Sequence, residues 1–152
     1  MKSRRIHGSI PLVTAGEANR GVADWITHNK VLFPANSLTI DMFGNVFYRD
    51  QPFFADDNIL VFSSNKKYSK KVMLFMSVVF SKALKGKFDY AHQFRQKSLP
   101  SVVIKLPVTP AGDIDFDFME NYITAIEKQS IRGVIEYKDK VIQTTEDVVN
   151  AN

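Results

Sequence analysis

The sequence predicts one α/β domain of the α+β kind: a small mixed or antiparallel sheet, a basic helix after it, and a C-terminal helix for assembly. Three observations support this prediction. Short apolar segments alternate with turn-forming residues over residues 9–62, apolar side chains recur every three or four positions over residues 68–84, and the last forty residues are helical in pattern. The 152 residues, 45% of them hydrophobic and 24% charged, suit a single soluble domain.

The predicted strands cover residues 9–14, 38–42, 46–48, 59–62 and 102–106. Gly44 and Asn45 form a hairpin signal between two of these strands. Pro107 closes the last strand, because proline has no amide proton for a ladder. Trp25 is expected in the core, because an apolar side chain of its size is costly to leave in water.

The first helix is predicted over residues 68–84, with Gly86 ending the pattern. Asp115 is the expected N-cap of the second helix. Beyond Gly133, valine and isoleucine recur every seven residues, which predicts a narrow heptad seam that packs on another helix of the same chain or of a partner. The seam consists of Val134, Ile135, Val141, Ile142, Val148 and Val149.

Several function classes lack their sequence signals. The chain has no cysteine, which excludes disulfides, thiolate metal sites and a cysteine nucleophile. The apolar run 72–80 is about half of the roughly 18 residues that a membrane span needs. The three histidines lack metal-ligand spacing, and no phosphate loop or dinucleotide fingerprint occurs. We therefore expect no cofactor, no metal and no membrane, and a cytoplasmic location fits the composition.

Positive charge is concentrated in one part of the chain. The net charge is +4, yet residues 62–100 carry nine basic groups and a single acid, Asp89. Such an excess favours a polyanionic partner, although a solvated helix surface is the alternative. Lysines at a helix N-terminus oppose the helix dipole, so phosphate binding or a merely tolerated surface must account for them.

The loop at residues 87–97 interleaves aromatic side chains with basic and amide ones. Lysine suits phosphate contacts, whereas glutamine and arginine can form paired hydrogen bonds with base edges. The alternative is a surface loop that its aromatic residues anchor to the core. Phosphate contacts are predicted for Lys66, Lys67, Lys70, Lys71 and Lys87. Base contacts are predicted for Tyr90, His92, Gln93, Arg95 and Gln96, with Asn19 and Arg20 from an earlier loop.

A metal-dependent nuclease is an alternative of a different class. Such enzymes combine an acidic residue with a Glu-x-Lys triplet on a strand to hold a divalent cation. Here Asp113, Asp115 and Asp117 precede Glu136-Tyr137-Lys138. The triplet lies in the heptad-patterned helical region, which argues against this alternative.

Three stretches follow a recognisable order. The first joins Gly8-Ser-Ile-Pro-Leu-Val-Thr14 to residues 18–26, and the second is the hairpin and the two strands of residues 38–62. The third and most specific joins Lys87-Phe-Asp-Tyr90 and Gln93 to Ile104-Lys-Leu-Pro107, Gly112 and residues 115–123. In these stretches, which cover most of residues 8–125, the chain resembles the target recognition domain of type I restriction–modification specificity subunits. The same domain occurs in related type II enzymes that cut on both sides of their site.

The resemblance implies a non-catalytic subunit that recognises double-stranded DNA and directs a methyltransferase subunit and a restriction subunit to it. It implies a target recognition domain over residues 1–112 and the start of a conserved spacer helix over residues 113–152. Ala91-His92 stand where the family has Gly-Arg, so the base preference is expected to differ. A full specificity subunit has two such domains and two long helices. This chain is therefore a split or excised portion, a half-subunit that forms a homodimer through its C-terminal helix, or a truncated form that mainly dimerises or binds the methyltransferase.

Overall fold

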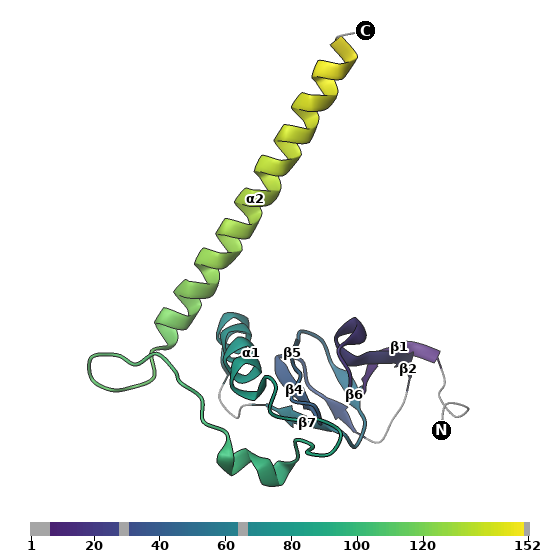
Figure 1. The fold of residues 1–152 in the computed structure, drawn as a ribbon, viewed down its shortest axis with the longest axis vertical. Coiled ribbons are helices and arrows are strands. Elements are labelled where there is room, and N and C mark those ends of the chain that lie inside the picture. The colour runs from purple at the N-terminus through teal and green to yellow at the C-terminus, as the bar shows by residue number, and fades with distance from the viewer. Residues whose placement is uncertain (1–6, 28–30, 64–66, 151–152) are drawn as a thin grey trace.

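The computed structural model describes residues 7–27, 31–63 and 67–150, with only the backbone of residues 7 and 148–150. Two small sheets and a helix form a compact body, and a second, long helix projects from it (Figure 1). This arrangement confirms the predicted α+β class.

The first sheet has four strands in the order β2-β1-β6-β3. β1 and β6 are parallel, and the other pairs are antiparallel, so the sheet is mixed. Leu12, Ile26 and Phe54 form its buried cluster. The strands are β1 (His7–Val13), β2 (Val22–Ile26), β3 (Leu32–Phe33) and β6 (Phe53–Ala55).

The second sheet is antiparallel, in the order β5-β4-β7. Every residue of β4 is buried. The hairpin predicted around Gly44 is confirmed, with Leu38 opposite Tyr48 and Ile40 opposite Val46. Gly44 has φ 81°, which favours glycine in this turn. The strands are β4 (Ser37–Asp41), β5 (Val46–Arg49) and β7 (Ile59–Phe62).

Helix α1 (Lys70–Leu84) packs on β4 and β5 and shares one core with the second sheet. Ser69 caps it by accepting a hydrogen bond from the amide of Val72 at 3.3 Å. The buried side chains of this core include Leu38, Met73, Leu84 and Phe94. The helix ends where the sequence predicts and begins two residues later.

Helix α2 (Phe116–Asn150) has 35 residues and is therefore about 52 Å long. Asp115 caps it as predicted, accepting from the amide of Phe118 at 2.8 Å. Only the first turns pack on α1: Met119 is 0% exposed, and the ring of Phe75 meets those of Phe118 and Tyr122 edge-on. The helix continues through Gly133 without a break.

Two predictions about the fold are wrong. Residues 102–106 form no strand; they follow the 3-10 helix η3 (Gln96–Ser101) as an extended segment that packs on the core. Their alternating burial arises because Val102 and Ile104 contact the core while Val103 faces solvent. Trp25 is 44% exposed because it lies on the outward face of β2, at the edge of the first sheet.

Candidate nucleic-acid interface

A shallow hollow of about 490 Å³ lies where three segments meet. These are a first loop between β1 and β2, which includes η2 (Ala18–Gly21), the β4–β5 turn, and the end of α1 with a second loop, residues 87–97, after it. The two loops are far apart in the sequence and border the same hollow, but none of the predicted base-contacting residues is among those that line it. The lining residues are Gly16, Glu17, Phe43, Gly44, Asn45, Ser81, Lys85, Gly86 and Phe88.

The first loop contains a left-handed turn. Asn19, Arg20 and Gly21 have φ angles of 48°, 54° and 76°, a conformation that is uncommon for residues other than glycine. The amide of Thr14 donates to the carbonyl of Gly21 at 2.8 Å and closes the loop at its base. Asn19 and Arg20 are both exposed, as base contacts require, and Asn19 Nδ2 donates to the carbonyl of Val22 at 3.3 Å. Part of the Arg20 guanidinium, however, donates to the carbonyl of Tyr48.

A buried arginine of β5 donates a hydrogen bond to the backbone of this turn. Arg49 is 6% exposed; its Nε donates to Thr39 Oγ1 at 2.9 Å and its Nη2 to the carbonyl of Arg20 at 2.7 Å. Its guanidinium also lies 5.4 Å from the ring centre of Phe47. Burial, with a smaller effect of the Arg20 guanidinium, lowers the pKa of Arg49 well below the ordinary arginine value, to about 10. Arg49 therefore remains a cation at neutral pH.

The second loop is ordered by Asp89. Its Oδ1 accepts from the amides of Ala91 and His92 at 2.8 and 2.7 Å, and these bonds, that of His92 first, lower the pKa of Asp89. Tyr90 is 79% exposed at this turn, and His92 is exposed beside it. The imidazole lies 3.5 Å from the carboxylate of Asp89, an ion pair only when His92 is protonated.

Of the three further predicted base-contacting residues, two have side chains that are hydrogen-bonded within the protein and one is exposed. Arg95 donates to Asn58 Oδ1 at 3.1 Å and to Gln93 Oε1, so its guanidinium anchors the loop to the turn before β7. Gln93 in turn donates to the carbonyl of Tyr90 at 3.3 Å. Gln96 is exposed and lines a second hollow of about 420 Å³. Tyr90, His92 and Gln96 are therefore the members of this loop with the most outward side chains.

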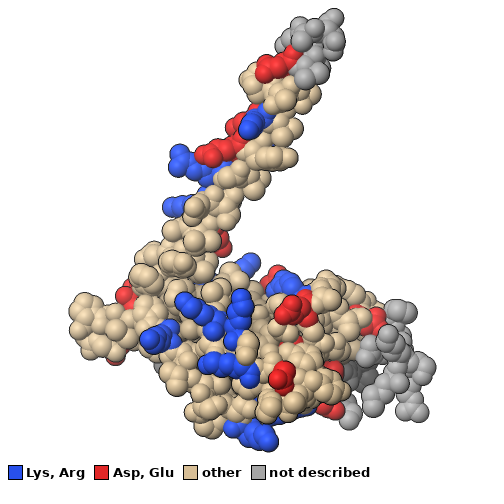
Figure 2. Space-filling view, viewed as in Figure 1, with Lys and Arg blue, Asp and Glu red and all other residues tan. Residues whose placement is uncertain are grey.

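Exposed lysines lie along α1 and in the segment after it, with Lys70 about 22 Å along the helix axis from Lys85. Figure 2 shows Lys and Arg side chains gathered over α1 and the segment that follows it, whereas acidic side chains lie on the β1 and β2 side of this face. Lys66 lies outside the described residues. Of the other predicted phosphate contacts, Lys67, Lys70 and Lys87 are exposed. The sequence reasoning missed Lys85, which lines the first hollow.

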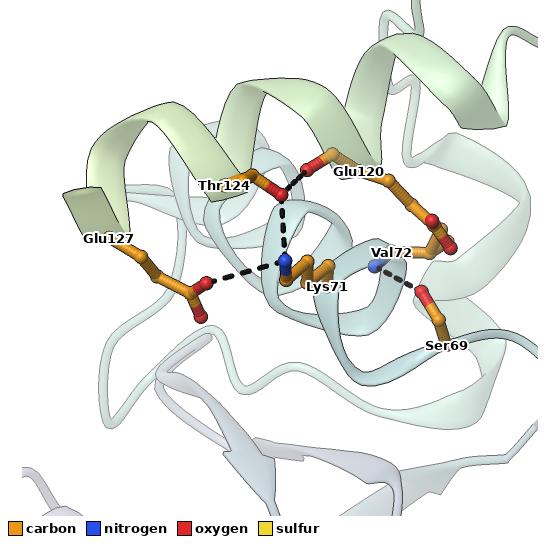
Figure 3. Close-up of polar contacts among 6 residues, drawn as sticks. All are labelled: Ser69, Lys71, Val72, Glu120, Thr124 and Glu127. Atoms are coloured by element: carbon orange, nitrogen blue, oxygen red, sulfur yellow. Dashed lines mark hydrogen bonds and ion pairs between the residues drawn. The ribbon is translucent and has the colours of Figure 1, made fainter.

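Lys71 has a structural contact instead of a free ammonium group. Its Nζ donates to Thr124 Oγ1 at 2.7 Å and lies 3.5 Å from a carboxylate oxygen of Glu127, both on α2 (Figure 3). One of the lysines in the first turn of α1 therefore holds the two helices together. This contact explains why a lysine is tolerated there despite the helix dipole.

The heptad seam has no partner within the described part of this chain. Residues 125–147 of α2 are exposed throughout, including Val134, Ile135, Val141 and Ile142. The side chains of Val148 and Val149 lie outside the described residues. Packing of the seam within the same chain, one of the two predicted possibilities, is therefore ruled out for the four described residues. No described helix combines the length and apolar character that a membrane crossing requires.

The nuclease arrangement is not assembled. Asp115 caps α2, and Glu136 lies about 30 Å further along that helix, where it pairs with Arg132 at 3.3 Å. Over residues 7–27, 31–63 and 67–150, no three His, Asp or Glu side chains are grouped so that they could hold a metal ion.

Comparison with known proteins identifies a family. Residues 2–137 match the family model described as type I restriction modification DNA specificity domain. Over 133 residues the chain is 30% identical to the type II restriction enzyme specificity subunit S.BcgI of Heyndrickxia coagulans, which covers 85% of this chain and 39% of that protein. A crystal structure of the type I restriction-modification system S subunit from M. genitalium is similar in fold, with a TM-score of 0.61 and 14% identity over 92% of this chain and 36% of that one. The chain thus spans well under half of either relative.

Proposed function

The chain belongs to the family of type I restriction modification DNA specificity domains, and we propose that it recognises a specific DNA sequence for a restriction–modification system. The observation that carries this proposal is the meeting of the two loops at a hollow lined by Lys85, at the end of the helix α1 over which the lysine-rich face lies. A face of this kind combines the two requirements of sequence-specific binding. Cations contact the phosphates and fix the position of the protein, whereas side chains on the loops contact the bases.

The lysines supply the phosphate contacts in this proposal. Lys67, Lys70 and Lys87 are exposed on α1 or beside it, and Lys85 reaches the hollow between the loops. Lys71 contributes little, because its ammonium group is engaged by α2. Binding to a random sequence should therefore depend on the first four lysines and weaken steeply with salt.

Base contacts come from the exposed side chains of the two loops. Asn19 and Arg20 belong to the first loop, and Tyr90, His92 and Gln96 belong to the second. Asparagine, glutamine and arginine can form paired hydrogen bonds with base edges in the major groove. Gln93 and Arg95 act mainly on the shape of the second loop, because they are hydrogen-bonded within it or to Asn58.

We assign no catalytic step to this chain. Methylation and cleavage are the work of the methyltransferase and restriction subunits that it directs to DNA, and we place this role in the cytoplasm. A methyltransferase reaches its target base by flipping it out of the duplex, which requires only that the specificity subunit hold the duplex in register.

Fluorescence anisotropy with a random-sequence duplex of 30 base pairs tests the proposal. At 50 mM salt the chain is expected to bind, and the affinity is expected to fall by about 10²-fold at 200 mM salt, because about four phosphate contacts give a slope of about 3.6. Absence of binding at 50 mM salt would refute DNA recognition by this chain alone. The truncated-form alternative would then be favoured if the chain still dimerised.

We also propose that the chain pairs with a second copy through the seam on α2. Four apolar side chains of the seam are about half exposed or more on a helix that projects away from the body, and heptad-spaced apolar residues pack on a facing helix. Ile135→Asp with Ile142→Asp should convert a dimer into a monomer in analytical ultracentrifugation. Gln129→Asp with Gln143→Asp is the matched control, because helix geometry puts these residues on the opposite side of α2. A monomeric wild type would rule out the homodimer.

A further inference from the structure

The β4–β5 hairpin holds the first loop at both ends through two buried polar side chains. Asp41, 3% exposed, accepts the amide of Gly16 at 2.8 Å at the start of the loop. Arg49 donates to the carbonyl of Arg20 at 2.7 Å at its end. Two hydrogen bonds from the same hairpin therefore fix the two ends of the loop.

The same hairpin also holds the second loop. Asp41 fixes the β4–β5 turn by accepting from the amides of Phe43 and Asn45, both at 2.9 Å. Within that turn, the carbonyl of Met42 accepts the amide of Phe94 at 2.8 Å. The two loops on either side of the hollow are therefore attached to one frame, which fixes their relative position.

Burial of the Arg49 guanidinium is unfavourable for the stability of the fold. Its buried guanidinium forms no ion pair with a carboxylate among the described residues; its partners are Thr39 Oγ1, the carbonyl of Arg20 and aromatic rings. A buried cation destabilises a core unless hydrogen bonds or a nearby opposite charge compensate, and the charge of Asp50 acts on Arg49 less strongly than burial does. One of its hydrogen bonds is made to the left-handed turn, whose backbone conformation at Asn19 and Arg20 is itself unfavourable.

We propose that Arg49 is a positioning residue for base recognition, which holds the turn of residues 19–21 so that Asn19 and Arg20 meet DNA in one fixed geometry. The inference rests on the proposed function for its consequence in DNA binding. Its structural part, the hold on the turn, can be measured without DNA. Arg49 itself is too deeply buried to contact DNA.

Limited proteolysis with trypsin measures the hold on the turn directly, because trypsin cuts after arginine and the bond after Arg20 lies inside the turn. In Arg49→Met, cleavage at this bond should accelerate by about tenfold to a hundredfold, as expected from the loss of a hydrogen bond from a charged donor. Arg49→Lys should also accelerate cleavage, because an ammonium group cannot reproduce the forked pair of hydrogen bonds. Thr39→Val, which is nearly isosteric and removes the Nε acceptor, should act in the same direction and serves if Arg49→Met does not fold. Arg132→Met, on an exposed face of α2, is the charge-matched control.

Selection of preferred duplexes from a randomised library measures the consequence for recognition. Arg49→Met should keep its affinity for the random 30-base-pair duplex within about threefold, while the preference at the base pairs under the first loop is lost. Unchanged cleavage after Arg20, or an unchanged selected sequence, would overturn the proposal. A wild type that selects no sequence at all would instead refute the proposed function, and the cleavage rates would still decide whether Arg49 holds the turn.

Discussion

Removing three lysines of the basic face should reduce the salt dependence of DNA binding by a defined amount. The variant combines Lys70→Ala, Lys85→Ala and Lys87→Ala, all at exposed positions on α1 or directly after it. Each phosphate contact adds about 0.9 to the slope of log affinity against log salt, so the slope should become shallower by about 2.7. Between 50 and 200 mM salt, the wild type should then lose about 40-fold more affinity than the variant.

The assay is fluorescence anisotropy of the random 30-base-pair duplex over that range of salt concentrations. The control removes the same charge from the exposed, projecting part of α2 by replacing Lys128, Lys138 and Lys140 with alanine. The control should retain at least about two thirds of the wild-type slope, because its lysines lie away from the two loops. Equal effects of the two variants would refute the reasoning, since they would show that only net charge matters.

Three further predictions concern stability and the second loop. Lys71→Ala should lower the free energy of unfolding, measured in urea, by at most about 1 kcal/mol. It should leave the slope of log affinity for DNA against log salt unchanged. A slope shallower by about 1 would mean that Lys71 contacts phosphate. Met119→Ala should lower the free energy of unfolding by about 2–5 kcal/mol, because this residue is fully buried in the part of α2 that packs on the body. A loss below about 1 kcal/mol would contradict that packing. Hydrogen bonds from His92 and Ala91 lower the pKa of Asp89 below 3.8, so the stability they provide is present above that pH and is lost as pH falls through the lowered pKa. A carboxyl titration by NMR should give a midpoint below 3.8, and a midpoint at or above that value would contradict the loop geometry.

Local patterns in the sequence predicted the elements that depend on local chemistry. The hairpin around Gly44, the strand β7 and the end of α1 lie where turn residues and apolar periodicity put them. Asp115 caps α2 as its position before the apolar pattern indicated. The strand predicted over residues 102–106 is absent because an apolar run closed by a proline suits an extended segment that packs on the core without a partner strand equally well.

The features that depend on long-range contacts were not visible in the sequence. Lys71 belongs to a basic run, yet its partner Thr124 is 53 residues away on another helix. Arg49 lies in an apolar strand, and nothing in its local sequence indicates a function. Its proposed role depends on a hydrogen bond to the carbonyl of Arg20, which is 29 residues away. Trp25 was misplaced because nothing in its local pattern shows that β2 is an edge strand.

The central claim is that the two loops recognise a base sequence together. Competition between the selected duplex and a scrambled duplex of equal composition, at 150 mM salt, tests it most directly. The wild type should prefer the selected duplex by about 10³-fold or more. Asn19→Gly, which tolerates the left-handed conformation, and Gln96→Ala, one from each loop, should each reduce that preference by about tenfold or more without weakening the affinity for the scrambled duplex. Equal affinity of the wild type for both duplexes would contradict the account.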